Sequence, residues 1–337
     1  MFELDSKPCG ETGAVAGGTA CAAILSRWKL AMMIARRELR LVMRGRLARG
    51  TLGLLAVVAF LPPLLLSLRA GTLGLASFRE VAALELAFAE VALPLIGLLA
   101  GADLLAGEGE DGTLLPIASL PISRAVCFFG KLAGRTAMVV ASYLCAFGSA
   151  GIAIALVRGS AKWTDYAAVA GAGLALCLAC MAIGVALGQP HRGRTRAFGA
   201  ATVAWIVMVF ALDAVLLGAV VALAPVPPED VGSHGYGEMA AQREMMKLHE
   251  LDDNGDEPHD GGRTEAPWQM AQWLVALDPV DLFRFTALLG SPTLHQRATV
   301  GLGESGPGWI MLATAWLAWI AAPIGFALRR FANADLR

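Results

Sequence analysis

The chain has 337 residues, of which 56% are hydrophobic and only 16% are charged, and its mean hydropathy is +0.60. Soluble domains carry about 25% charged residues, so this composition excludes an ordinary soluble protein and indicates one that spans a membrane. The net charge of −1 identifies no class of partner, because the charges are segregated along the chain. None of the six cysteines lies in the long polar stretch before the last apolar run, so no disulfide framework is expected.

The N-terminal part of the chain changes character at Leu25. Residues 1–24 are small and glycine-rich, without a basic flank before an apolar core, so we expect a flexible tail and no cleavable signal peptide. Residues 25–50 repeat apolar side chains every three to five positions and place arginines on the other faces. A basic amphipathic helix of this kind suits an anionic membrane surface. We therefore predict an interfacial helix over residues 25–50.

Six apolar stretches approach or exceed the roughly 17 to 25 residues that a helix needs to cross hydrocarbon. They are Thr51–Leu68, Leu86–Ala106, Ala137–Val157, Tyr166–Gly188, Phe198–Ala224 and Trp309–Leu328. Pro62 and Pro63 should kink the first of them, because proline lacks the amide donor of the helical ladder. The predicted fold is an all-α polytopic membrane protein, with five spans in residues 51–224 and the sixth, with its tail, in residues 309–337.

The orientation follows from the lysines and arginines. They gather before the first span, after the second, after the fourth and after the last, which are all on one side. By the positive-inside rule this side is the cytoplasm, so both termini should be cytoplasmic. Residues 225–308 then lie outside; they are acidic, broken by glycine and proline, and should be partly flexible, with short helices dipping into the membrane. Asp278 should cap one of these helices and Pro279 should occupy its first turn.

A polar segment, Glu108–Lys131, separates the second and third spans and cannot itself sit in hydrocarbon. Asp111 and Thr113 can cap a short helix that begins at Leu114, Pro121 ends it, and Ser123 caps a second helix. The second helix carries Arg124 and Lys131. The segment therefore predicts two short helices folded back at the cytoplasmic face. An ordinary charged loop of a polytopic protein is the alternative.

The segment contains the runs E-x-E-x-G-T-L, S-L-P-I-S-R and G-K, and these resemble the signature of permeases of type-two ABC exporters. In that family the matching segment is the coupling helix, which docks on a separate ATPase subunit. The positions to which the resemblance gives an ATPase-coupling role are Glu108, Glu110, Gly112, Thr113, Leu114, Pro121, Ser123, Arg124 and Lys131.

Other parts of the chain resemble the branch of this family that serves maturation of nitrous oxide reductase. The matching features are the run IARRELRLVMRGR, the placement of Asp103, the run ALDAVLLGAVVAL with Asp213, and an outer-helix motif with Asp278, Pro279, Asp281 and Arg284. The resemblance implies a homodimer in the bacterial inner membrane that pairs with a cytoplasmic ATPase dimer, which binds ATP and Mg. It also implies a periplasmic maturation protein, a copper chaperone as a further candidate partner, and assembly of copper–sulfur centres.

Two other functions stay open at this point. One is a generic ABC exporter of lipid, glycan or peptide, and the other is a membrane scaffold that transmits ATPase movements without passing cargo. The chain has no Walker motif of its own, because Leu132 follows Gly130-Lys131 and Ala125 stands where the first glycine should be. We therefore expect a permease and not an enzyme, with no cofactor bound by this chain and no nucleic-acid partner.

Three acids within or beside the predicted spans are candidates for a transport pathway: Asp213, Asp103 and Glu90. A carboxylate at mid-membrane costs roughly 2.5 to 3.5 kcal/mol on insertion scales. Each acid either lines a pathway or is protonated or paired at a helix interface. For Asp213, near the middle of the fifth span, both interpretations stay open. For Asp103 and Glu90, nearer the ends of the second span, the interface is favoured.

Soft metal ligands occur in two places. Cys177 and Cys180 lie in the fourth span, and Met245 and His249 are four residues apart in the outer loop. Sulfur suits Cu(I) and imidazole suits several transition metals. Small cysteines in a glycine- and alanine-rich helix are usually packing residues, however. Met245 and His249 are weak candidates, and no metal site is predicted. The acidic run near residues 252–263 lacks the glycine and final glutamate of an EF-hand.

Overall fold

The computed structural model describes residues 12–69, 78–110, 123–158, 163–188, 193–212, 277–290 and 309–333, together with residues 214, 215 and 218. The elements in chain order are α1 (Thr12–Arg44), α2 (Arg46–Arg69), α3 (Phe78–Glu110), α5 (Arg124–Arg158), α6 (Trp163–Leu187), α7 (Gly193–Ile206), the π-helical turn η1 (Val207–Ala211), α11 (Pro279–Gly290) and α13 (Trp309–Asn333). These residues form helices and no strand, which confirms the predicted all-α fold class.

Six helices in the described part are long and apolar enough to cross a membrane, which confirms the predicted number of spans. They cover Ala48–Leu66, Val81–Gly107, Arg124–Leu156, Thr164–Leu187, Gly193–Ala211 and Ile310–Asn333. The largest difference from prediction is in α5, which is one continuous helix, whereas a short helix from Ser123 and a separate span from Ala137 were expected. Nothing breaks the helix between them, because Gly134 packs against α1 and no proline intervenes.

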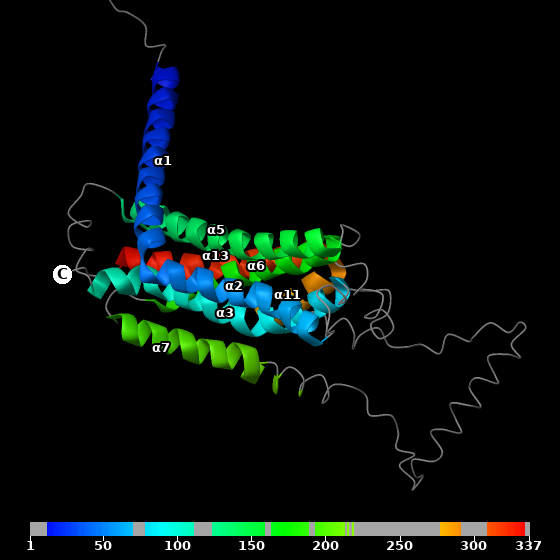
Figure 1. The fold of residues 1–337 in the computed structure, drawn as a ribbon. Coiled ribbons are helices and arrows are strands. Elements are labelled where there is room, and N and C mark those ends of the chain that lie inside the picture. The colour runs from blue at the N-terminus through cyan, green and yellow to red at the C-terminus, as the bar shows by residue number, and fades with distance from the viewer. Residues whose placement is uncertain are drawn as a thin grey trace, which may run out of the picture.

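The spans run side by side as one bundle, while α1 leaves one end of it at a steep angle (Figure 1). α1 packs on α5, and α7 packs along α3. α1 begins at Thr12, earlier than the boundary expected near residue 24, because residues 12–24 contain several alanines and no proline that would end the helix. It ends at Arg44, where the Gly45 N–H donates to Val42 O at 2.9 Å and the chain turns into α2.

The centre of the bundle is the contact between α3 and α6. Gly97 and Gly101 face the main-chain carbonyls of Cys177 and Met181, and a Cβ at either glycine would overlap them. Gly184 of α6 and Gly188, which directly follows α6, face Leu98 O and Ala102 O in the same way. Small residues allow membrane helices to approach backbone to backbone, where many weak van der Waals contacts add up. α3 and α6 therefore form a closely packed pair.

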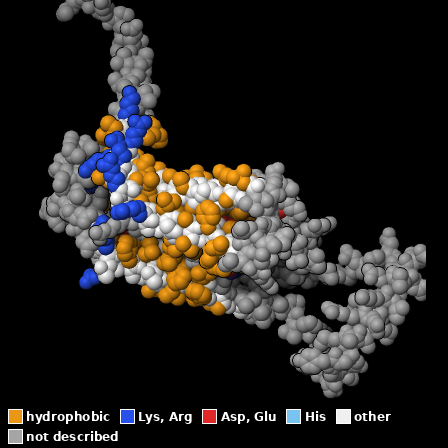
Figure 2. Space-filling view, in the orientation of Figure 1, with side chains coloured by type: hydrophobic (Ala, Val, Ile, Leu, Met, Phe, Trp, Pro, Cys, Tyr) orange, Lys and Arg blue, Asp and Glu red, His pale blue; other side chains and the backbone are white. Residues whose placement is uncertain are grey.

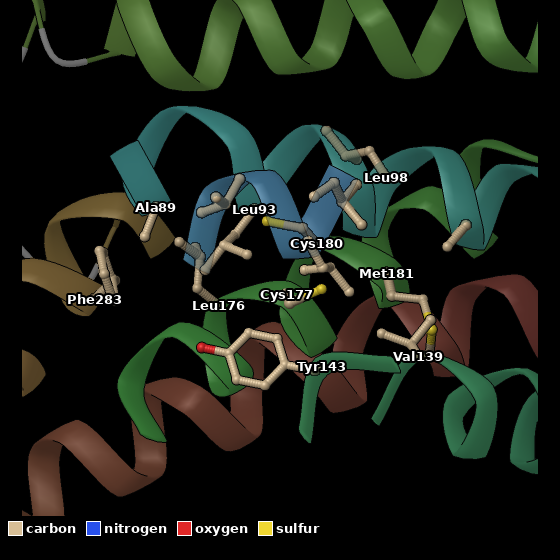
Figure 3. Packing of buried hydrophobic residues seen from close by; sticks show 14 of the residues in the cluster. Ala89, Leu93, Leu98, Val139, Tyr143, Leu176, Cys177, Cys180, Met181 and Phe283 are labelled. Atoms are coloured by element: carbon tan, nitrogen blue, oxygen red, sulfur yellow. The ribbon is translucent and has the colours of Figure 1, made fainter. Parts of the chain in front are cut away.

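Cys177 and Cys180 are fully buried in this contact, where Leu93, Leu98 and Leu176 surround them (Figure 3). Phe283 of α11 reaches the same core from another segment. The two cysteines are thus packing residues of α6. No group of three histidine, cysteine or acidic side chains that could hold a metal ion occurs in the part of the chain that is described. Met245 and His249 lie outside that part.

The surface divides into an apolar belt and a basic end (Figure 2). Large apolar side chains are exposed along the spans, among them Leu54, Phe60, Leu144, Phe210 and Leu317. Lysine and arginine side chains gather where α1 leaves the bundle (Figure 2). We call this end, which holds Arg124, Arg135, Arg194 and the C-terminus of α3, the basic end. A belt of this kind suits contact with lipid, because exposed apolar area in a soluble protein would be unfavourable.

Candidate functional site

Four charged side chains from four helices meet at the basic end. Asp103 of α3 receives hydrogen bonds from Arg135 Nη1 of α5 at 3.1 Å and from Arg194 Nε of α7 at 2.9 Å. Arg135 Nη2 lies 3.6 Å from Glu38 Oε1 of α1. We call Glu38, Asp103, Arg135 and Arg194 the ion-pair network. It joins α1, α3, α5 and α7, and its two acids balance its two arginines.

The centre of the network is buried. The side chains of Arg135 and Asp103 are only 6% and 10% exposed, whereas that of Arg194 is 42% exposed. Gly107, one turn after Asp103, makes room for Arg194, because a Cβ there would lie 2.9 Å from Arg194 Nη2. Removing one member of a buried ion pair leaves an uncompensated charge, which costs about 3–5 kcal/mol. The Arg135–Asp103 pair is therefore the part of the network on which the packing depends most.

α1 reaches this network across two glycines of α5. A Cβ on Gly130 would lie 2.9 Å from Ile34 Cβ, and one on Gly134 would lie 2.7 Å from Ala35 O. Lys131, between them in sequence, is only 4% exposed and lies within electrostatic range of Glu38. Lys131 was expected on the docking surface. The structure instead places it at the interface between α1 and α5, because the helix that carries it is the start of a span.

The predicted coupling segment begins at the end of α3 and ends in α5. Ser123 caps α5, because its Oγ accepts a hydrogen bond from Val126 N at 3.4 Å, which confirms the predicted cap. Arg124 Nη1 donates to Ala332 O of α13 at 2.9 Å. Glu108 and Glu110 form the last turn of α3. Gly112, Thr113, Leu114 and Pro121 lie outside the described residues.

A second group of charges lies at the opposite end of the bundle. Arg284 of α11 donates to Glu90 Oε2 of α3 at 2.7 Å and to Asp281 Oδ1 at 2.8 Å. Asp278 caps α11, since its Oδ1 accepts from Val280 N at 2.9 Å, and Pro279 is the first residue of the helix, as predicted. The outer-helix motif thus folds α11 and fixes it to α3.

The structure therefore shows Glu90 and Asp103 paired at helix interfaces, which was one of the two interpretations of these acids. Asp213 lies outside the described residues. Sequence reasoning missed Glu38, Arg135 and Arg194 as the partners. One signal was available, because an arginine inside an apolar helix needs an acid from a neighbouring helix.

Residues 32–336 match the model of a family described as ABC-2 family transporter protein. The chain belongs to the ABC-2 transporter family. That match begins within α1 and includes every span, so the ABC-2 assignment covers the whole bundle and not one motif.

Two curated relatives of this ABC-2 protein are each described as a probable ABC transporter permease protein NosY. The one from Pseudomonas aeruginosa is 27% identical over 305 residues, which cover 87% of this chain and 94% of the relative. The one from Stutzerimonas stutzeri is 26% identical over 307 residues, which cover 88% and 96%. Together with the six apolar helices, these similarities establish an integral membrane permease subunit of an ABC transporter. The family implies a partner ABC ATPase and a dimeric arrangement.

Proposed function

We propose that this ABC-2 permease couples a separate cytoplasmic ATPase to a step outside the membrane, the assembly of the copper–sulfur centres of nitrous oxide reductase. The support is the resemblance of four separate motifs to that branch, together with similarity over nearly full length to two permeases named NosY. A periplasmic maturation protein and a copper chaperone are the outer partners that this proposal requires. The permease acts as a homodimer with an ATPase dimer.

The orientation in this proposal places the basic end in the cytoplasm of a bacterial cell and the membrane-crossing bundle in its inner membrane. Lysine and arginine side chains concentrate at that end, where α1 leaves the bundle (Figure 2). Arginine and lysine favour the cytoplasmic side of membrane proteins. Both termini are then cytoplasmic, and the segment from Glu108 to Lys131 faces the ATPase.

The ion-pair network is the observation that carries the coupling mechanism. Asp103 lies seven residues before the end of α3, which is about 10 Å at 1.5 Å per residue. A displacement of the segment after Glu110 therefore moves the part of α3 that carries Asp103. Asp103 holds Arg135 and Arg194, and Arg135 also approaches Glu38. A shift of α3 is therefore transmitted to α1, α5 and α7 together. Interfaces of this kind change between discrete packings and do not deform continuously.

A scaffold that transmits force without passing cargo is the second candidate, and one observation favours it. α3 and α6 touch backbone to backbone at four glycines, so they move as a rigid pair and transmit displacement well. ATP-dependent accumulation of sulfide or Cu(I) in inverted vesicles distinguishes the two functions. Accumulation above the level of an ATPase-dead complex supports transport, whereas ATP hydrolysis without accumulation of either supports the scaffold.

The ATPase coupling itself is tested by reversing charge at the start of the segment. Glu108→Lys with Glu110→Lys should abolish co-purification with the cognate ABC ATPase from membranes. The matched control is Glu229→Lys with Asp230→Lys, which makes the same charge change in the predicted outer loop and should leave the complex intact. If the Glu108 and Glu110 variant retains the ATPase at the control level, with ATP hydrolysis still dependent on the permease, this coupling role is wrong.

A further inference from the structure

A fully buried acid at the end opposite the basic end has no role in either charge group described above. Glu85 of α3 is 0% exposed, and neither of its carboxyl oxygens has a hydrogen-bond partner in the part of the chain that is described. Glu90, little more than one turn further along α3, is in contrast paired with Arg284. A buried carboxylate without a donor or a cation is strongly unfavourable. The surroundings of Glu85 must therefore favour its neutral form.

The packing of α3 on α6 fixes what faces Glu85. Gly97 lies against Cys177 and Gly101 lies against Met181, so the two helices run parallel in a constant register. The same register brings Glu85 level with Asp165 and Tyr166, near the start of α6. The Tyr166 hydroxyl interacts with the Glu85 carboxyl group. Tyr143 of α5 is within electrostatic range of it and belongs to the same core (Figure 3).

The protons of both hydroxyl groups are already used. Tyr166 donates to Phe147 O at 2.8 Å, and Tyr143 donates to Ala170 O at 2.8 Å. A carbonyl oxygen only accepts, and a hydroxyl has one proton, so each tyrosine oxygen can offer Glu85 only a lone pair. An ionised carboxylate also has only lone pairs to offer. A protonated Glu85 has an O–H that suits the lone pair of a tyrosine oxygen, so the two tyrosines favour the neutral acid over the carboxylate.

The stretches of α2, α5, α7 and η1 that run through the bundle, and whose side chains the structure describes, carry no cation; the side chains of Arg69, Arg79 and Arg158, at the helix ends on this side, lie outside that description. α2 from Gly50 to Leu66, α5 from Thr136 to Leu156 and α7 with η1 from Ala197 to Leu212 carry no lysine, arginine or histidine. Arg284 of α11 is bound to Glu90 and Asp281. The other buried ionisable groups at this end are acids, Asp165 of α6 and Asp278 before α11.

We propose that Glu85 is a proton-binding site, at which the closed packing of α3, α5 and α6 holds one proton per copy of the chain. When these helices separate, water reaches the site, the Glu85 O–H bond breaks, and the proton passes to that water. When they close again, water returns a proton to the carboxylate. Proton binding in the closed packing follows from the site alone. Its exchange during an ATPase-driven cycle rests on the proposed function.

Infrared spectroscopy of the purified full chain in lipid nanodiscs, without any ATPase, tests the site. A protonated carboxyl group has a C=O stretch that a carboxylate lacks. At neutral pH the wild type should show this band, Glu85→Gln should lose it, and the matched control Glu90→Gln should keep it. Absence of the band from the wild type, or its full persistence in Glu85→Gln, would overturn the proposal. Neither result would bear on ATPase coupling, because no ATPase is present.

A second variant keeps the test decisive if Glu85→Gln does not fold. Tyr166→Phe removes the hydroxyl group that interacts with the Glu85 carboxyl group while the ring stays in place. Because the C=O stretch of a carboxylic acid rises when its O–H loses an acceptor, the band should move to higher frequency. A band that does not move in Tyr166→Phe would show that the protonated group is not Glu85 in this setting, and the proposal would be wrong.

Discussion

Arg135 Nη1 lies 3.1 Å from Asp103 Oδ2, and this pair joins α5 to α3. The predicted coupling segment connects the same two helices, because it runs from the end of α3 to the start of α5. Both side chains are nearly buried, so they are compensated by each other and by the rest of the network and not by water. The pair links the segment expected to meet the ATPase to the packing of the spans. Four predictions follow from this pair, from the contact of α3 with α6 and from the ion pairs that hold α11 at the opposite end of the bundle.

Removing one charge of this pair should lower the free energy of unfolding by more than removing the second charge afterwards. Asp103→Ala leaves Arg135 buried without its closest partner and should lower the free energy of unfolding by about 3–5 kcal/mol. Removing both charges, Asp103→Ala with Arg135→Ala, should lower the free energy of unfolding by less than the sum of the two single losses, because neither charge is then left buried without the other. Unfolding midpoints in one detergent, measured for Asp103→Ala, Arg135→Ala and the double variant, give the coupling energy. Additive effects of the two substitutions would show that the residues do not interact.

The two arginines of the network should contribute differently to the stability of the folded protein. Arg135→Ala removes a side chain that is 6% exposed and holds both Asp103 and Glu38. Arg194→Ala removes one that is 42% exposed, and solvent-exposed ion pairs contribute at most about 1 kcal/mol. Arg135→Ala should therefore lower the unfolding midpoint clearly more than Arg194→Ala. The nearby Arg196→Ala, at an exposed position of α7, serves as the control and should change the midpoint little.

The close contact of α3 with α6 predicts opposite effects for two glycine substitutions. Gly101→Ala places a Cβ on Met181 O and should destabilise by about 1–3 kcal/mol, as overpacking does. Gly171→Ala, in α6, meets nothing within 4 Å and should be neutral or stabilise by up to about 1 kcal/mol. Thermal unfolding of both variants provides the comparison. Equal effects would contradict the backbone contact at Gly101.

The ion pairs of Arg284, which hold α11 on α3, should contribute less to the free energy of unfolding than the buried Arg135–Asp103 pair. Arg284→Gln leaves Glu90 and Asp281 without the guanidinium that bridges them, but all three side chains keep some contact with solvent, so about 1–2 kcal/mol is expected. Arg284→Lys keeps the charge but not the two-pronged geometry, and should fall between the wild type and the glutamine variant. Protease cleavage near residues 277–290, followed over time, measures release of the helix. A cleavage rate unchanged in Arg284→Gln would show that these ion pairs do not hold α11.

The sequence by itself determined the class of protein and its local signals. Hydropathy fixed the number of spans, because crossing hydrocarbon requires about twenty apolar residues wherever a helix is later placed. Ser123 and Asp278 were recognisable as caps, since a cap bonds to an amide within three residues of itself. The runs around Glu108 and Arg124 carried the family resemblance in the same way, by residues close together in the chain.

Only the tertiary structure decided which distant residues meet. Asp103 and Arg194 are 91 residues apart in the chain, and their contact depends on which helices are neighbours, a fact that no local pattern contains. Lys131 changed from an expected surface residue to a buried one because α1 covers that face of α5. The burial of Glu85 is also decided by which helices are its neighbours. Its carboxyl group is ordinary in sequence, and only the packing of α3 against α5 and α6 leaves it without a hydrogen-bond donor among the described residues.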